Sequence, residues 1–191
     1  MQAIDALLSR HSARALTEPA PDAGALELIF AAAVRAPDHG RLRPWRFVLI
    51  GGAARAQLGE LLAAHLTRGA VRPSEETLER ERQKAYRAPL IVAVAAHVNP
   101  AVKIPAVEQL LSAGAAAHAM MLAAAALGFG AMWKTGGAAY DPQVCAGLGL
   151  EPEDALVGFL YLGSESQPSA HAGSREWRDL VRLLPGGGPS A

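Results

Sequence analysis

Residues 106–127 read AVEQLLSAGAAAHAMMLAAAAL, a predicted helix with apolar side chains on nearly every face. A helix that is apolar nearly all round has to be covered by protein on more than one side. The run is long enough to cross a bilayer, but it consists mostly of Ala and contains His118, which favours a buried helix of a soluble protein. In a chain of 191 residues, one of the covering surfaces could be a second subunit.

Strand and helix signals alternate on both sides of this helix. We expect strands at 45–50, 90–98, 131–135 and 156–163. We expect further helices at 4–10, 23–35, 53–67 and 75–86, and a short helix that opens at Asp141-Pro142. Four strands interleaved with helices predict a mixed α/β or α+β sandwich with one central sheet.

The composition is typical of a cytosolic protein with a single domain. A length of 191 residues suits one domain, and half of the residues are apolar, which allows a sizeable core. Eighteen basic residues balance eighteen acidic ones, which argues against nucleic-acid binding and electrostatic membrane attachment. The N-terminus lacks the apolar segment of a signal peptide, so we expect a cytoplasmic protein. The use of fifteen Arg but three Lys indicates a GC-rich bacterial genome.

The sequence carries none of the common phosphate-binding or metal-binding motifs. The run Gly128–Thr135 approaches a Walker loop, but Trp133 replaces its second glycine and would block close approach of the backbone to a phosphate. No G-x-G-x-x-G follows a strand and the six His are scattered, so we expect neither a Rossmann site nor a metal site. The single Cys145 excludes an internal disulfide and is expected to be a small buried side chain.

Polar residues in the predicted loops are the remaining candidates for ligand binding. They are Arg10, His11, Ser12, Arg14, Arg35, Asp38, His39, Arg41, Lys134 and Thr135. An Arg with a hydroxyl and loop amides suits a phosphate, because a guanidinium offers two parallel hydrogen bonds and Ser adds another. Ordinary structural roles stay open as well, since Arg35 could complement a helix C-terminus and His39 could be a turn residue.

Four motifs resemble, in the same order, the signatures of the flavin nitroreductase family. The first is Arg10-His11-Ser12-Ala13-Arg14, and the second is Arg35-Ala36-Pro37-Asp38-His39 followed by Arg43-Pro44-Trp45-Arg46-Phe47. The third joins Ser112-Ala113-Gly114, Met120–Ala124 and Leu127–Gly130 with Trp133, and the last is Val157–Gly163. The likeness runs from residue 1 to about 165 and is greatest to the compact YdjA-type NAD(P)H nitroreductases.

This resemblance implies a fold and an assembly. It implies an α+β three-layer sandwich, whose central mixed or antiparallel sheet is flanked by helices, and a homodimer with FMN sites at the interface. Residues 1–165 would form a single FMN-binding domain. Residues 166–191 would form a C-terminal arm that wraps the partner subunit and is flexible at its end.

The resemblance also implies the residues of the site. FMN would be held by Arg10, His11, Ser12, Trp133, Lys134 and Thr135, with Arg35 and His39 reaching the FMN held mainly by the other subunit. The nicotinamide cofactor would lie along Ala123, Ala124, Ala125, Ala126, Leu127 and Gly128. His11 stands where a second Arg is common in the family. Lys134 would favour the anionic reduced flavin from beside the N1–C2=O edge of the ring.

The same resemblance implies an oxidoreductase that passes hydride from NAD(P)H to bound FMN and then to a nitroaromatic, a quinone or a similar small electrophile. No catalytic side chain is required, since the flavin supplies the chemistry. Three alternatives stay open. The chain could be an FMN-binding carrier or sensor with little turnover, a flavoenzyme of the same fold with a different reaction, or a helical interaction module without a cofactor.

Overall fold

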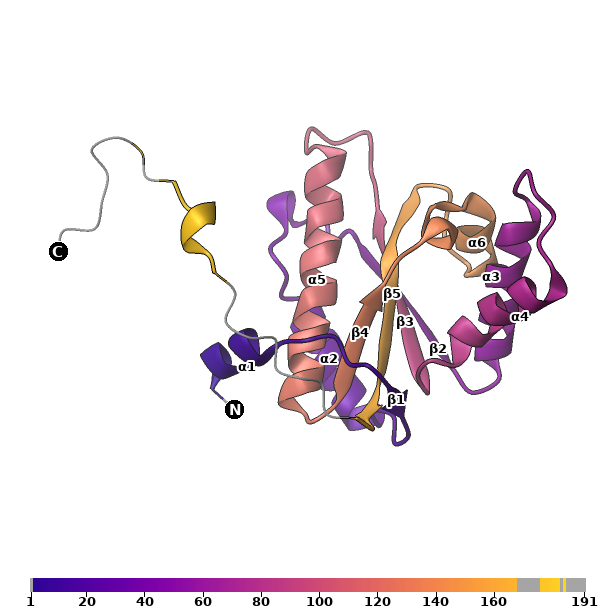
Figure 1. The fold of residues 1–191 in the computed structure, drawn as a ribbon. Coiled ribbons are helices and arrows are strands. Elements are labelled where there is room, and N and C mark those ends of the chain that lie inside the picture. Colours follow the sequence, from indigo (N-terminus) through magenta and orange to yellow (C-terminus); the bar gives the residue numbers. More distant parts are fainter. Residues whose placement is uncertain (1, 168–175, 183, 185–191) are drawn as a thin grey trace.

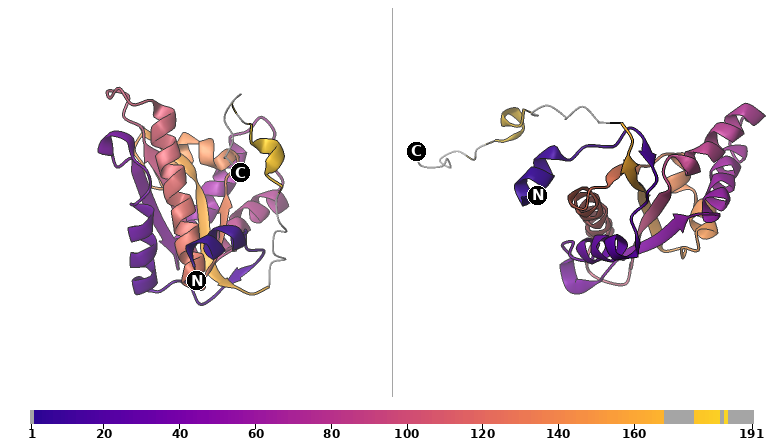
Figure 2. Two further views of the ribbon diagram at one scale, coloured as in Figure 1. Left: turned by 90° about the vertical axis from the view of Figure 1, so that its left-hand side faces the viewer. Right: turned by 90° about the horizontal axis from the view of Figure 1, so that it is seen from below.

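The computed structural model describes residues 2–167, 176–182 and 184, and shows a central sheet between two layers of helices (Figure 1, Figure 2). Helices α2 and α5 cover one face of the sheet, and helices α3, α4 and α6 lie on the other. The predicted three-layer α+β sandwich is therefore confirmed. Most of the predicted C-terminal arm, residues 166–191, lies outside the described residues.

The sheet has β5 at its centre, and every pairing described is antiparallel. Its strands are β1 (Leu16–Thr17), β2 (Trp45–Gly51), β3 (Leu90–His97), β4 (Gly130–Lys134) and β5 (Asp154–Glu165). β5 pairs with β1, β3 and β4, and β2 pairs with β3. The sequence predicts four of these strands and misses β1, because two residues carry no periodicity. β5 extends beyond the predicted 156–163, since its first residue pairs with His97 and its last with Leu16.

The helices begin and end within two residues of the predicted bounds, with one exception. They are α1 (Ala3–Ser9), α2 (Ala23–Ala33), α3 (Ala54–Thr67), α4 (Glu75–Gln83), α5 (Ala106–Ala126) and α6 (Pro142–Gly147). Side-chain caps explain two of the starts, because Asp22 accepts from the Ala25 amide at 2.8 Å and Ser74 from the Thr77 amide at 3.3 Å. The prediction of a continuous helix to residue 86 is wrong. The chain tightens into a 3-10 turn, η2 (Lys84–Tyr86), on its way into β3.

The long helix α5 is buried on one side by this chain. Met120 is fully buried in a cluster with Ile29 of α2 and Val92 of β3. The opposite side remains open, with Val107 58% exposed and Leu111 66% exposed. By length and composition alone α5 could cross a membrane, but its packing on α2 and the sheet is that of a core helix.

The indole of Trp133 fits into a gap that two glycines leave open. Gly158 of β5 lies at a β-bulge in the pairing of β3 with β5 and has φ 156°. A Cβ atom on Gly158 would lie 2.3 Å from Trp133 Nε1, so the indole occupies the space that a side chain there would need. On the helix side, a Cβ atom on Gly114 would lie 3.8 Å from Trp133 Cη2. The indole is thus held between β5 and α5.

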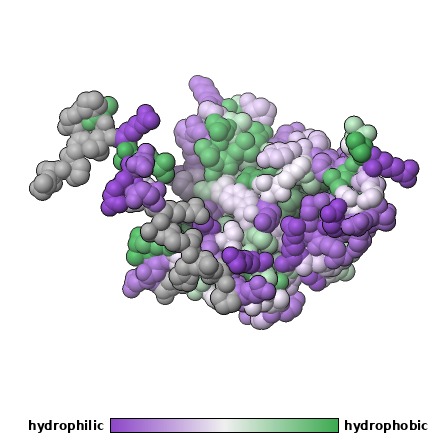
Figure 3. Space-filling view, viewed as in Figure 1, coloured by the Kyte–Doolittle hydropathy of each residue, from purple (hydrophilic) through white to green (hydrophobic). Residues whose placement is uncertain are grey.

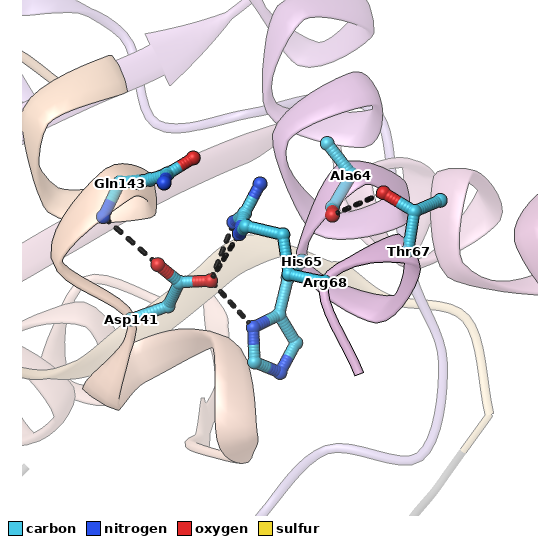
Figure 4. A network of polar contacts seen from close by, with 6 residues as sticks. All are labelled: Ala64, His65, Thr67, Arg68, Asp141 and Gln143. Atoms are coloured by element: carbon cyan, nitrogen blue, oxygen red, sulfur yellow. Dashed lines mark hydrogen bonds and ion pairs between the residues drawn. The ribbon is translucent and has the colours of Figure 1, made fainter. Parts of the chain in front are cut away.

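A polar network ties α3 to the loop that follows β4 (Figure 4). Asp141 Oδ2 accepts from His65 Nδ1 at 2.7 Å and from the guanidinium of Arg68, while Oδ1 accepts from the Gln143 amide at 2.8 Å. Burial alone would raise the pKa of Asp141, but these hydrogen bonds outweigh it and hold the pKa well below its usual range. The network therefore fixes the loop that begins directly after β4.

Replacing Gly158 by Ala should destabilise the protein, since the added methyl group clashes with the indole of Trp133. We expect the free energy of unfolding to fall by about 1–3 kcal/mol, measured by urea denaturation. Gly24→Ala in the first turn of α2 is the matched control, because only Asp22 Oδ1 lies near, at 3.6 Å, and Ala favours a helix. Equal stabilities of Gly158→Ala and the wild-type protein would contradict this packing.

The Asp141 network should stabilise the fold at neutral pH and lose its effect in acid. The folded pKa of Asp141 is depressed, so its contribution is complete above the unfolded pKa of about 4 and declines as the pH falls through the folded pKa. Asp141→Asn should therefore lower the free energy of unfolding by about 1–3 kcal/mol at pH 7.

The difference in stability between the wild type and Asp141→Asn should narrow progressively towards pH 2, measured by urea denaturation across the pH range. The exposed Glu153→Gln variant, which removes a carboxylate outside the network, serves as the control and should follow the wild type. A constant difference between Asp141→Asn and wild type from pH 7 to pH 2 would rule out this source of acid sensitivity.

Candidate functional site

The first predicted FMN motif lies beside the C-terminal end of α5. Arg10 and His11 directly follow α1 and line a cavity of about 330 Å³, called here the Arg10 cavity. Ala125 and Gly128, at the end of α5, line the same cavity. The structure thus brings two predicted FMN residues next to the stretch predicted for the nicotinamide cofactor, residues 123–128.

Two neighbours hold the imidazole of His11. Its Nδ1 lies 3.0 Å from the Ser9 carbonyl oxygen, and its Nε2 lies 3.1 Å from the Glu165 carboxylate. The hydrogen bond to the Ser9 carbonyl and the contact with Glu165 raise the pKa of His11, although partial burial acts against them. His11 therefore keeps a positive charge beside Arg10 to higher pH than a free imidazole does. Ser12 follows as an exposed residue.

A second cavity, of about 410 Å³, carries three cationic side chains from distant parts of the sequence. This cationic pocket is lined by Arg14, Ala15, Leu16, Arg87, Met132 and Lys134. No carboxylate lines it, and within the described part of the chain none of its three cations forms an ion pair. Unbalanced cations in a concave site attract an anionic or electron-rich ligand.

The sequence identifies only part of this cationic pocket. Lys134 is a predicted site residue, and Arg14 belongs to the first motif, so the sequence carries a signal for both. Arg87 lies between η2 and β3, outside every motif, and nothing in its local sequence marks it. The pairing of the strands brings Arg87 to the same cavity as Lys134.

Neighbouring side chains of β4 belong to opposite faces of the sheet. Met132 packs in the core on the α3 side, and Lys134 lines the cationic pocket, whereas Trp133 packs with the residues that contact α5. The side chains of Trp133 and Lys134, predicted to lie together along the flavin, are therefore separated by the sheet. Thr135 is exposed just beyond the strand.

Arg35 and His39 lie away from Arg10, towards the N-terminal end of α5. His39 Nδ1 lies 2.6 Å from Glu108 Oε2 in the first turn of α5, and Arg35 is exposed just beyond the end of α2. α5 has 21 residues, so at roughly 1.5 Å per residue its ends are about 30 Å apart. Within one chain, the structure does not bring Arg35 and His39 to the Arg10 cavity.

A larger cavity, of about 590 Å³, lies between α6 and the start of β5 and holds none of the predicted site residues. Tyr140 and the half-buried Cys145 line it. Burial raises the pKa of the Cys145 thiol, which disfavours a reactive thiolate. Among the residues that the structure describes, no group of three or more His, Cys, Asp or Glu side chains could hold a metal ion.

Residues 7–164 match the model of the Nitroreductase family. The chain is 40% identical over 166 residues to YdjA of Escherichia coli (strain K12), a protein named as an NAD(P)H nitroreductase. The match covers 86% of this chain and 88% of YdjA. The structure of a nitroreductase-like family protein from Bacillus cereus has a TM-score of 0.82 at 22% identity, with 96% of each chain covered. A protein from Desulfovibrio desulfuricans, named as a nitroreductase and solved with FMN, has a TM-score of 0.74 at 26% identity, covering 97% of this chain and 98% of its own. With this family match and this identity to YdjA, the chain belongs to the nitroreductase family.

Proposed function

We propose that this chain is an FMN-dependent oxidoreductase of the NAD(P)H nitroreductase type, with a nitroaromatic, a quinone or a similar electrophile as acceptor. The observation that carries the proposal is a pair of cation-lined cavities on the segment 10–16. One cavity holds Arg10 and His11, and the other holds Arg14 and Lys134. The relative named NAD(P)H nitroreductase and the neighbour solved with FMN support the choice of cofactors.

Each of the two cavities has a chemistry that fits one part of FMN, and the cavities lie on opposite faces of β4, with Ala131 in the first and Met132 in the second. FMN joins an anionic phosphate to a flat ring system with carbonyl acceptors on one edge. The Arg10 cavity offers a guanidinium and the His11 imidazole, with the Ser12 hydroxyl next in sequence, and these donors suit the phosphate. Glu165 lines the same cavity, where its carboxylate lies 3.1 Å from His11 Nε2 and leaves Arg10, within the described part of the chain, as the unpaired cation. The cationic pocket combines apolar wall from Leu16 and Met132 with cationic side chains, which suits the ring and its electron-rich edge.

The chemistry supplied when the cofactor is bound is two-electron transfer from NAD(P)H to the electrophilic acceptor. The residues of the chain bind and orient the reactants and set the local charge. Arg10 and Ser12 would anchor the phosphate, and Lys134 would place a positive charge at the edge of the ring. The nicotinamide cofactor would approach along residues 123–128, two of which line the Arg10 cavity.

The open side of α5 supports a homodimer. Val107, Leu111, Gly114 and His118 follow one another at spacings of four and three residues, so they form one stripe on the helix. Figure 3 shows apolar surface gathered over the upper part of α5, where Val107 and Leu111 are exposed. A second copy of α5 would cover the exposed apolar side chains of this stripe.

A dimer would also complete the site. If two α5 helices pack antiparallel, the N-terminal end of one helix lies beside the C-terminal end of the other. The first end carries Glu108, which contacts His39, and the second lies beside the Arg10 cavity of the other chain. Arg35 and His39 would then act on the FMN held mainly by the other chain, and the arm 166–191 would wrap that chain. The proposed location is the cytoplasm. The balance of eighteen basic and eighteen acidic residues argues against a nucleic-acid partner.

The purified protein should bind FMN, with the absorption spectrum of a flavoprotein, and should oxidise NAD(P)H when an acceptor is added. Arg10→Ala should weaken FMN binding by about tenfold or more, because one charged hydrogen bond to phosphate contributes roughly 1.5–3 kcal/mol. Isothermal titration calorimetry on the protein stripped of cofactor measures this.

Arg72→Ala, at an exposed position outside both cavities, is the matched control and should bind FMN as the wild type does. If Arg10→Ala binds FMN with unchanged affinity, Arg10 is not part of the site. If the wild-type protein binds FMN but does not oxidise NAD(P)H with any acceptor, it is a carrier or sensor, and the proposed activity is wrong.

Shared sites predict recovery of activity in mixed dimers. Consider a mixed dimer of an Arg10→Ala chain and a chain that carries Arg35→Ala and His39→Ala. One of its two sites contains all three substitutions, and the other contains only wild-type residues. Such mixed dimers, co-expressed with two affinity tags and purified by both, should recover up to about half of the wild-type activity.

The matched control for this recovery pairs an Arg35→Ala chain with a His39→Ala chain. Each site of that mixed dimer keeps one damaged residue, so no recovery is expected. Absence of recovery in the first pair, or an active monomer that retains FMN, would show that each site belongs to a single chain.

A further inference from the structure

We infer that Arg87 is a third cation of the flavin ring site, where it joins Arg14 and Lys134 in stabilising the negative charge that the ring edge gains on reduction. The inference rests on the proposed function, because it takes FMN as the ligand. Arg87 belongs to none of the family-like motifs, and its place in the site comes from the structure alone.

Three separate segments place these cations around one cavity. Arg14 comes from the loop before β1, Arg87 from the junction between η2 and β3, and Lys134 from the end of β4. Leu16 and Met132 complete the wall with apolar surface. Side chains that approach from three directions surround a ligand edge more closely than side chains of one segment can.

In the described part of the chain Arg87 forms no ion pair, although Glu76, Glu79 and Glu81 line a neighbouring cavity with it. Burial raises the pKa of Tyr161, a residue that pairs with Met132 across β4 and β5, and the positive charge of Arg87 acts in the opposite direction. The acid that also acts on Tyr161 is Glu81, and its carboxylate pairs with Lys84 instead. Arg87 therefore contributes to the cationic pocket a positive charge that no carboxylate of the pocket lining neutralises.

The composition of the pocket favours the ring over the phosphate as the part bound there. A phosphate site is typically built from hydroxyls and loop amides together with Arg, and that combination lies at Arg10 and Ser12. The cationic pocket has no hydroxyl among its lining residues. Its apolar wall would gain nothing from contact with a phosphate, because a phosphate has no apolar surface to bury against it. A flat ring with one electron-rich edge uses both the apolar wall and the cations.

Arg87→Met should therefore weaken the binding of reduced FMN more than that of oxidised FMN. We expect a differential loss of about tenfold, which corresponds to a fall of about 30 mV in the two-electron midpoint potential. The measurement is a redox titration of the holoprotein, together with the affinity for oxidised FMN from calorimetry. Lys134→Met should shift the potential in the same direction, and Arg87→Lys, which keeps the charge, should recover most of the wild-type potential.

Arg80→Met is the matched control for the loss of a nearby surface charge. Arg80 lies on α4, hydrogen-bonds to Thr77 and does not line the cationic pocket, so its removal should leave the potential unchanged. Raising the ionic strength should reduce the difference between Arg87→Met and the wild type, because Arg87 is exposed to solvent. Thermal unfolding of each variant verifies that the fold is retained.

An unchanged midpoint potential in Arg87→Met, or the same shift in Arg80→Met, would overturn the assignment of Arg87. Equal weakening of reduced and oxidised FMN would also overturn it, since Arg87 would then not respond to the negative charge that the ring gains on reduction. Failure of the wild-type protein to bind FMN is a separate result. It would remove the proposed function itself, before Arg87 is tested.

Discussion

The packing of α5 against the sheet and α2 is the interaction on which the rest of the structure depends. Its buried face is rich in small side chains around Met120, which lets the helix lie close to β3 and to α2. Gly128, with φ 87°, turns the chain directly from this helix into β4. The position of α5 therefore sets where β4 runs, and with it the places of Lys134 and of the wall of the Arg10 cavity.

The pleat of β4 directs neighbouring side chains of the predicted FMN motif to opposite faces of the sheet. Trp133 faces α5 and is accommodated by Gly114 and Gly158, whereas Met132 and Lys134 belong to the other face. The indole contributes apolar burial that keeps the strand in register, and the ammonium remains available to a ligand. A motif of adjacent residues thus serves two purposes, because a strand directs neighbouring side chains to opposite sides.

Local charge matters more in this molecule than total charge. The chain as a whole has eighteen residues of each sign, yet three cations share one cavity without a lining carboxylate. Two acids that lie beside Arg87 in a neighbouring cavity form ion pairs with other residues, Glu81 with Lys84 and Glu79 with Arg82. A neutral protein can therefore hold an anionic cofactor, since what a ligand meets is the field of its own pocket.

The sequence by itself determined most of the helix bounds, the four longer strands and the first family-like motif, because caps, periodicity and turn residues act over a few neighbours. It also marked Lys134 and the segment from Arg10 to Arg14. Only the tertiary structure decided that β1 pairs with the end of β5, that the cationic pocket includes Arg87, and that His39 and Arg10 lie at opposite ends of α5, a helix about 30 Å long. These features depend on strand register and helix packing between residues far apart in the chain, and no local pattern encodes such contacts.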